Sequence, residues 1–182
     1  MPKVMVPIAD GVEEMEAVII IDVLRRADWE VVSVGLTDAI VTASRGVRLA
    51  PDKGWTAIDP GDFDWIVLPG GMPGTEALMA DERVLDALRR HVEAGRPCAA
   101  ICAAPLVLQA AGLLSGRTYT SHPSVASRLT EGQRTDDRVV RDNGLITSQG
   151  PGTAFEFALA IVAADAGPEK TSQLAAAMVL PR

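Results

Sequence analysis

The chain has 182 residues, of which 48% are hydrophobic, and a formal net charge of −7. This length and apolar content predict one domain over residues 1–182 with one hydrophobic core. The acidic balance argues against nucleic acid and anionic membranes as partners, because both bind clustered Lys and Arg, and a small molecule is the expected ligand. No apolar run reaches the roughly 18 residues of a membrane span. The first residues lead directly into a strand rather than a signal peptide, so we expect a cytoplasmic protein.

Apolar runs of strand length alternate with longer segments of helical period, which is typical of an α/β fold with a mainly parallel sheet. The predicted elements, in chain order, are a strand at 3–8, a helix at 13–27, a strand at 30–35, a hairpin from 39–41 and 47–49, a strand at 65–68, a helix at 81–93, a strand ending before Cys102, a helix after it, a strand at 118–121, a hairpin from 139–140 and 145–148 with its turn at 142–144, a helix at 153–164, and a short helix from 169.

The predicted helix at 13–27 is apolar on nearly all sides, with the run Ala17 to Ile21 followed by Val23 and Leu24. A helix packed on one face of a sheet normally keeps a polar side. Another surface must therefore cover this helix. A homodimer through it is the interpretation that we favour, and burial under neighbouring loops is the alternative.

Cys102 lies where an apolar strand-like run stops and a helix begins. Small residues stand two positions before it (Ala100) and two positions after it (Ala104), as the crowded strand-turn-helix of a nucleophile elbow requires. The first turn of the following helix would stabilise a thiolate. The alternative is a buried strand cysteine that acts as a small hydrophobic residue. Cys98 is assigned to the core, about 13 Å away along an extended strand, so no disulfide with Cys102 is expected.

A cysteine nucleophile needs a group that handles its proton and donors that stabilise negative charge. In a doubly wound sheet these partners come from loops at the carboxyl ends of the strands, here residues 10–16, 70–74 and 121–123. The backbone N–H groups of Gly71 and Ala103 would form an oxyanion hole. A carboxylate beside a thiolate would be pushed toward its protonated form. The candidates are Glu13, Glu14 and Glu16, and spacing alone does not choose among them, since any of them could instead cap the helix.

Neither a cofactor nor a metal is expected. The segment 70–74 lacks both the G-x-G-x-x-G pattern and the lysine of a phosphate-binding loop, so no nucleotide site is predicted. One Cys, one His and one Glu from distant loops do not have the clustered spacing of metal ligands.

Taken together, these loops resemble the ThiJ/PfpI superfamily, and within it the DJ-one branch of small cysteine proteins. The resemblance spans almost the whole chain. It rests on EEME at 13–16, DVLRRA at 22–27, LPGG at 68–71, AAICAAP at 99–105, SHP at 121–123 and SQGPGTAFEFA at 148–158. It implies a flavodoxin-like, three-layer α/β sandwich with a mainly parallel sheet, and a homodimer.

The resemblance also assigns roles to site residues. It implies that Glu16 is the functional acid, protonated and hydrogen-bonded to the Cys102 sulfur, and that Glu13 is an interface position. The other positions that it places in or beside the site are the oxyanion donors Gly71 and Ala103, His122 near the thiol, and Arg26 and Arg45 at the dimer contact.

The function implied by the resemblance is a glutathione-independent glyoxalase that converts methylglyoxal, or a similar 2-oxoaldehyde, into lactate through Cys102 and Glu16. Deglycation of proteins and nucleotides is also attributed to the family. The main alternative is an oxidation-sensing, stress-protective protein in which Cys102 forms a sulfinic acid that protonated Glu16 would stabilise.

The chain departs from the family pattern at two positions. Ser124 stands two residues after His122, where related glutamine amidotransferases have an orienting Glu, so we expect a less firmly held imidazole and neither cysteine peptidase nor amidase activity. Gln149 stands where many members of the branch have a basic residue, so weaker anion binding is expected there.

Overall fold

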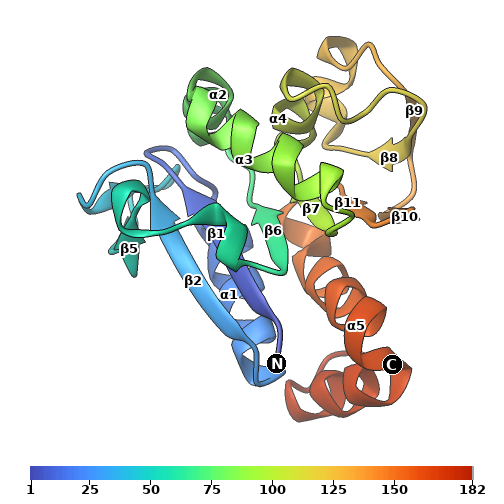
Figure 1. Cartoon of the computed structure of the whole chain (residues 1–182). Coiled ribbons are helices and arrows are strands. Elements are labelled where there is room, and N and C mark those ends of the chain that lie inside the picture. Colours follow the sequence, from blue (N-terminus) through green and yellow to red (C-terminus); the bar gives the residue numbers. More distant parts are fainter. Residues whose placement is uncertain (182) are drawn as a thin grey trace.

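The structure is a computed structural model that describes residues 1–181. Its main sheet has seven strands in the order β10-β11-β7-β6-β1-β2-β5, and each neighbouring pair is parallel except β10 with β11 (Figure 1). The strands are β1 (Lys3–Ile8), β2 (Glu30–Gly35), β5 (Lys53–Gly54), β6 (Trp65–Leu68), β7 (Cys98–Ile101), β10 (Val139–Asp142) and β11 (Leu145–Ser148).

Helices cover both faces of this sheet. Helices α1 (Glu14–Arg26) and α5 (Ala154–Ala177) pack together on one face, and α2 (Met72–Ala80), α3 (Glu82–Glu93) and α4 (Pro105–Ala110) cover the other (Figure 1). Every residue of β6 and β7 is buried, as expected for central parallel strands that have apolar contacts on both faces. The predicted three-layer α/β fold with a mainly parallel sheet is confirmed.

Two small sheets lie outside the main one. The predicted hairpin is the antiparallel pair β3 (Val41–Thr42) and β4 (Arg48–Leu49). The predicted strand at 118–121 is β8 (Thr118–Thr120), which pairs in parallel with β9 (Gln133–Thr135), a strand that the sequence analysis missed. The short 3-10 segment Pro123–Arg128 follows β8, and His122 is its N-cap.

Two other details differ from the sequence prediction. The segment after β6 does not stay a loop but starts α2 at Met72, because a proline in the first turn of a helix needs no N–H partner. Strand β10 extends to Asp142, so that the hairpin turn is made by Asn143 and Gly144, both with positive φ. The last two predicted helices are confirmed, because α5 consists of two helical segments separated by a kink at Gly167, where φ is 80°.

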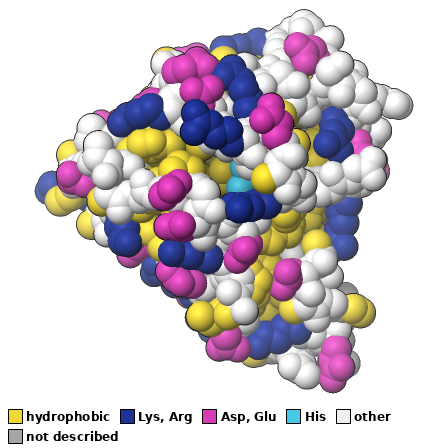
Figure 2. Space-filling view, viewed as in Figure 1, with side chains coloured by type: hydrophobic (Ala, Val, Ile, Leu, Met, Phe, Trp, Pro, Cys, Tyr) yellow, Lys and Arg dark blue, Asp and Glu magenta, His cyan; other side chains and the backbone are white. Residues whose placement is uncertain are grey.

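The surface has mixed charge. On the face shown in Figure 2, Lys and Arg side chains are interspersed with Asp and Glu, and apolar side chains emerge between them. Within residues 1–181, no helix is both long enough and apolar enough to cross a membrane.

Candidate active site

Cys102 lies in the turn between β7 and α4, at the carboxyl edge of the sheet, and has a φ of +65°. Positive φ is uncommon for a residue with a side chain and indicates a backbone held by its surroundings. Two hydrogen bonds hold it: Cys102 N–H donates to the Ser148 carbonyl (3.0 Å), and the Cys102 carbonyl accepts from His122 N–H (2.8 Å). The thiol is partly exposed. Cys102 therefore has the backbone of the predicted elbow, whereas Cys98 is 3% exposed and belongs to the core, as expected.

Glu16 lies in the first turn of α1 and its side chain is fully buried beside Cys102. One carboxylate oxygen, Oε2, accepts a hydrogen bond from Gly70 N–H (2.7 Å), and the carboxyl group also forms a hydrogen bond with the thiol of Cys102. Gly70 is needed at this contact, because a Cβ there would lie 2.6 Å from the Cys102 Cβ and 2.8 Å from Glu16 Oε2. The second oxygen, Oε1, is buried and has no hydrogen-bond partner among residues 1–181.

The other two candidate glutamates have different positions. Glu13 is the N-cap of α1, where its Oε2 accepts from Glu16 N–H (2.7 Å). Glu14 points toward the turn between β3 and β4, where it accepts from the Ser44 hydroxyl and from Arg45 N–H, both at 2.8 Å. The structure therefore places Glu16, and neither of its neighbours, against the sulfur.

Burial shifts the titration of both partners in the Glu16–Cys102 pair. It raises the pKa of Glu16 to about 7, against the hydrogen bonds from Gly70 and Cys102. Burial, followed by the negative charge of Glu16, raises the pKa of Cys102 to about 12, although the N–H groups of Gly71 and Ala103 lower it. The expected low pKa of the thiol is thus not found. The two groups titrate as a pair that carries one negative charge and one proton over a wide range of pH above 7.

The N–H groups of Gly71 and Ala103 both point at the Cys102 sulfur, so an oxygen on a carbon bonded to that sulfur would lie near them. Gly71 has a φ of +91°, and a Cβ there would collide with Glu13 N and Gly11 O. Glycine is therefore required at this position for two reasons. These are the two donors that the sequence analysis named.

His122 lies next to the elbow through its backbone, and its ring contacts Gly150. Its Nδ1 is 3.2 Å from Ser124 N, which donates to it, and 2.7 Å from Ser124 Oγ. Because a backbone N–H can only donate, Nδ1 is the acceptor and the neutral ring has its proton on Nε2. This is opposite to the tautomer of a general-base triad, in which Nδ1 donates to an acid. Contrary to expectation, the imidazole ring is therefore held in place, by Ser124. In this tautomer Nε2 of His122 is a hydrogen-bond donor.

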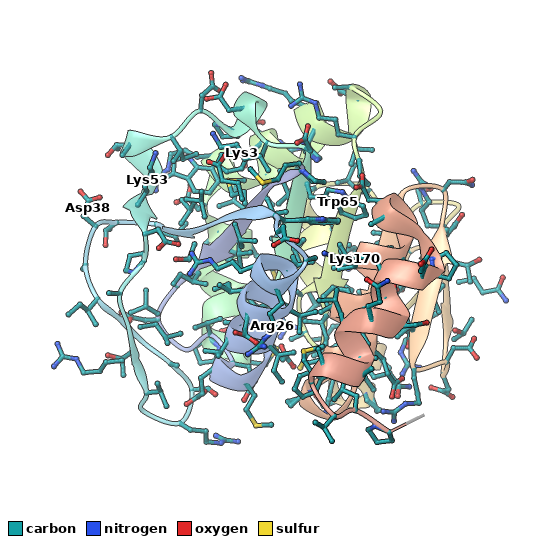
Figure 3. All side chains as sticks on the ribbon, turned by 90° about the horizontal axis from the view of Figure 1, so that it is seen from below. Lys3, Arg26, Asp38, Lys53, Trp65 and Lys170 are labelled. Atoms are coloured by element: carbon teal, nitrogen blue, oxygen red, sulfur yellow. The ribbon has the colours of Figure 1, made fainter. Side chains whose placement is uncertain are left out.

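The remaining predicted residues lie farther out. Arg26 forms an ion pair with Asp22 (2.6 Å) at the end of α1, about 15 Å along the helix from Glu16. Figure 3 shows it on the solvent side of that end, and within one chain the structure does not bring it to Cys102. Arg45 is exposed in the β3–β4 turn. Gln149 donates to the Asp136 carbonyl (2.9 Å).

Two residues of this region were missed by the sequence analysis in the roles that they have here. Ser124 was read only as the absence of an acid, and it fixes the imidazole. Met72 follows Gly71 directly and packs against the apolar cluster that includes Cys102. Its position in the linear sequence, next to a predicted oxyanion donor, was the available signal.

Comparison with known protein families gives a match over most of the chain. A model of the DJ-1/PfpI family matches residues 2–164. The chain belongs to the DJ-1/PfpI family. The resemblance on which the sequence analysis relied is confirmed.

Several DJ-1 proteins are similar over the whole chain. "Protein DJ-1 homolog B" of Arabidopsis thaliana is 46% identical over 98% of this chain, which spans only 41% of that relative's length. The Caenorhabditis elegans protein named "Glutathione-independent glyoxalase DJR-1.2" is 40% identical, with 91% of this chain and 89% of that protein covered.

Solved DJ-1 structures are also similar. Drosophila melanogaster DJ-1beta superposes with a TM-score of 0.95 at 43% identity, and an oxidized Toxoplasma gondii DJ-1 with the same TM-score at 39% identity; in both cases all of each chain is covered. The DJ-1 fold and family are therefore established for this chain.

Proposed function

We propose that this DJ-1/PfpI protein is a glutathione-independent glyoxalase that converts methylglyoxal or a similar 2-oxoaldehyde into the 2-hydroxy acid. The observation that carries the proposal is the buried Glu16 carboxyl group hydrogen-bonded to the Cys102 thiol, with the N–H groups of Gly71 and Ala103 directed at the same sulfur. A relative at 40% identity is named for this activity. The pair supplies a nucleophile and a group that can hold its proton.

The first step is addition of Cys102 to the aldehyde carbon. Ionised Glu16 takes the thiol proton as the C–S bond forms, and the aldehyde oxygen becomes an oxyanion between Gly71 N–H and Ala103 N–H. The oxyanion then takes up the proton from Glu16 and becomes the hydroxyl of a hemithioacetal. Glu16 is again a carboxylate, ready to act as a base.

The next steps move one proton between neighbouring carbons. Glu16 removes the C1 proton to give an enediol, and His122 Nε2–H donates to the ketone-derived oxygen. Glu16 then returns its proton to C2, and the C1 hydroxyl gives its proton back to His122, which leaves a thioester of lactate on Cys102. Water hydrolyses the thioester, which releases lactate and restores the thiol, so that the net reaction is addition of one water to methylglyoxal.

The test is formation of lactate from methylglyoxal without glutathione, with the fully reduced native protein beside Cys102→Ala and Glu16→Gln. Turnover that both substitutions abolish supports the mechanism. Absence of lactate with the native protein would overturn it. Deglycation belongs to the same proposal, because consumption of free aldehyde drains the adducts in equilibrium with it, and it is checked by release of unmodified amine from a methylglyoxal adduct.

A second candidate is an oxidation sensor, and the same sulfur environment favours it. Two equivalents of peroxide would convert the thiolate to sulfenate and then to sulfinate, with two waters released. Protonated Glu16 and the N–H groups of Gly71 and Ala103 are the donors that a sulfinate needs. Under this reading Glu16→Gln changes the stable oxidation state of Cys102, measured by intact mass, whereas native lactate production stays at the uncatalysed rate.

Peptidase or amidase activity is disfavoured. A triad needs Nε2 of His122 as a proton acceptor, and the hydrogen bonds from Ser124 put the proton of the neutral ring on that atom.

We also propose a homodimer through α1. Met15 and Val18 of this helix are 54% and 48% exposed in the single chain, and burial of such side chains favours association. Val18→Glu should convert a dimer into a monomer in light scattering. Val179→Glu is the control, because Val179 is 88% exposed at the other end of the chain. A monomeric native protein would contradict the proposal.

A further inference from the structure

A small apolar cluster lies beside Cys102. Ala103, Leu106 and Val125 form its buried part, and four half-buried side chains pack against it: Met72, Met79, Leu129 and Cys102 itself. The cluster joins the start of α2, the start of α4 and the 3-10 segment after His122. A group attached to the Cys102 sulfur would therefore have apolar side chains beside it.

Met72 occupies a particular place in this cluster. It is the first residue of α2 and follows Gly71, whose N–H points at the Cys102 sulfur. Its thioether sulfur is 3.9 Å from Nη1 of Arg128, and this guanidinium also pairs with Glu76 (3.4 Å). The Met72 side chain thus contacts a residue of the 3-10 segment that follows His122.

The bonds around a bound aldehyde carbon limit where its substituent can lie. One bond goes to the Cys102 sulfur, and the oxygen lies near the N–H groups of Gly71 and Ala103. Gly70 and the buried Glu16 close the inner side. The remaining direction leads outward past the first residue of α2, Met72, which directly follows Gly71.

We infer that Met72 is a specificity-determining residue: its side chain forms the wall against which the substituent R of a 2-oxoaldehyde R–CO–CHO packs, and it selects small apolar substituents. This inference rests on the proposed function, since it deepens the substrate class of the same site. A charged substituent would lose hydration against the cluster without an oppositely charged partner. A large apolar one would have to displace the thioether, which is flexible but tethered by Arg128.

The test compares Met72→Ala with a matched control. Met79→Ala removes the same side chain from the same helix, seven residues on, where Met79 packs between this cluster and the larger core. For each protein kcat/KM is measured with methylglyoxal and with phenylglyoxal. We expect Met72→Ala to shift the ratio about tenfold toward phenylglyoxal, the order of discrimination that a wall of a small apolar pocket provides, and Met79→Ala to leave it within about twofold. An unchanged ratio in Met72→Ala, or an equal shift in both variants, would overturn the inference.

A second readout does not depend on turnover. Cys102 is alkylated with iodoacetamide and with its N-phenyl analogue, and the two rates are compared by intact mass. Met72→Ala should raise the relative rate of the phenyl reagent several-fold, Met72→Leu should restore the native ratio, and Met79→Ala should leave it unchanged. If Met72→Ala shifts the alkylation ratio but the native protein produces no lactate, the glyoxalase proposal is overturned and the role of Met72 beside Cys102 is supported. Lactate production by the native protein, together with an unshifted alkylation ratio in Met72→Ala, would support the glyoxalase proposal and overturn the role of Met72.

Discussion

Glu14 and Glu16 lie two residues apart in the first turn of α1, and the regions around them shift the pKa of the carboxyl group in opposite directions. Glu14, 7% exposed, faces the β3–β4 turn. Hydrogen bonds from Ser44 and from backbone N–H groups of that turn lower its pKa, although burial opposes them. Glu16, fully buried at the sulfur, has a pKa raised to about 7 by burial, because its hydrogen bonds do not offset the loss of water.

The difference teaches that the loss of water and the number of donors together decide what a buried acid does. Both oxygens of Glu14 accept protein hydrogen bonds, so its charge is fixed and holds the turn in place. Glu16 Oε1, in contrast, has no hydrogen-bond partner among residues 1–181. An acid with a spare oxygen can exchange a proton near neutral pH, which is what general acid-base chemistry requires.

Exchange of each glutamate for its amide gives the largest expected effect. Glu16→Gln should lower kcat/KM for methylglyoxal by about 100-fold or more, because loss of a general base costs roughly 10²–10⁴-fold. Glu14→Gln, the matched control, keeps a carbonyl acceptor and should stay within about threefold of native. Lactate production by both variants is the measurement, and equal losses would show that the two regions do not differ as described.

The pH dependence of stability should separate the two regions next. The pKa of Glu16 in the folded protein is raised from its ordinary value of 4.5 to about 7, so the folded state holds this proton more tightly. The contribution of protonated Glu16 to the free energy of unfolding is full below pH 4.5 and is lost as pH rises toward 7. The loss is about 3 kcal/mol, at about 1.36 kcal/mol per pKa unit. For Glu14 the sign is opposite, and its stabilisation is lost as pH falls below 4.5.

Urea unfolding of native protein and Glu16→Gln at pH 5 and pH 8 measures this effect. The native free energy of unfolding should decrease between the two pH values by more than that of Glu16→Gln. Parallel curves would contradict the raised pKa.

Truncation of Glu14 should affect stability more than catalysis. Glu14→Ala leaves the Ser44 hydroxyl and Arg45 N–H without their acceptor, and we expect a loss of about 2 kcal/mol from these two hydrogen bonds. The measurement is urea unfolding at pH 7, with the exposed Glu30→Ala as a control. A loss no greater than that of the control would show that Glu14 does not hold the turn.

The smallest expected effect concerns the hydroxyl of Ser124. Ser124→Ala keeps the backbone N–H that donates to His122 Nδ1 and removes only the Oγ contact of 2.7 Å. We expect kcat/KM to fall about two- to fivefold, roughly the value of one exposed hydrogen bond. A fall as large as that of Glu16→Gln would mean that His122, and not Glu16, moves the critical proton.

Much of the fold can be predicted from the sequence, but the pKa shifts of the site residues cannot. The alternation of buried runs and helices predicts the layers, because burial on both faces makes parallel strands continuously apolar. The turn at Cys102 is also predictable, from its flanking alanines. Helix α2 was missed because Pro73 and Gly74 suggested a loop, although a first helical turn accepts both.

The choice of Glu16 could not come from spacing. The hydrogen-bond donors to Glu14 lie 30 residues away in the sequence, in the β3–β4 turn. No local sequence pattern predicts that contact. The expectation of an acidic thiol considered only the start of α4. In the structure, burial and the Glu16 charge outweigh the N–H donors at Cys102, and those effects depend on segments brought together from three strands.

The central claim is that Cys102 and Glu16 share one mobile proton, and the pH profile of Cys102 alkylation by iodoacetamide tests it most directly. Intact mass follows the reaction, and Cys98, which is buried, serves as the internal unreactive thiol. The account predicts that the native rate rises through a step near pH 7, where the pair loses its first proton, and that this step is absent in Glu16→Gln but present in Glu14→Gln. Identical profiles in the native protein and Glu16→Gln would contradict it.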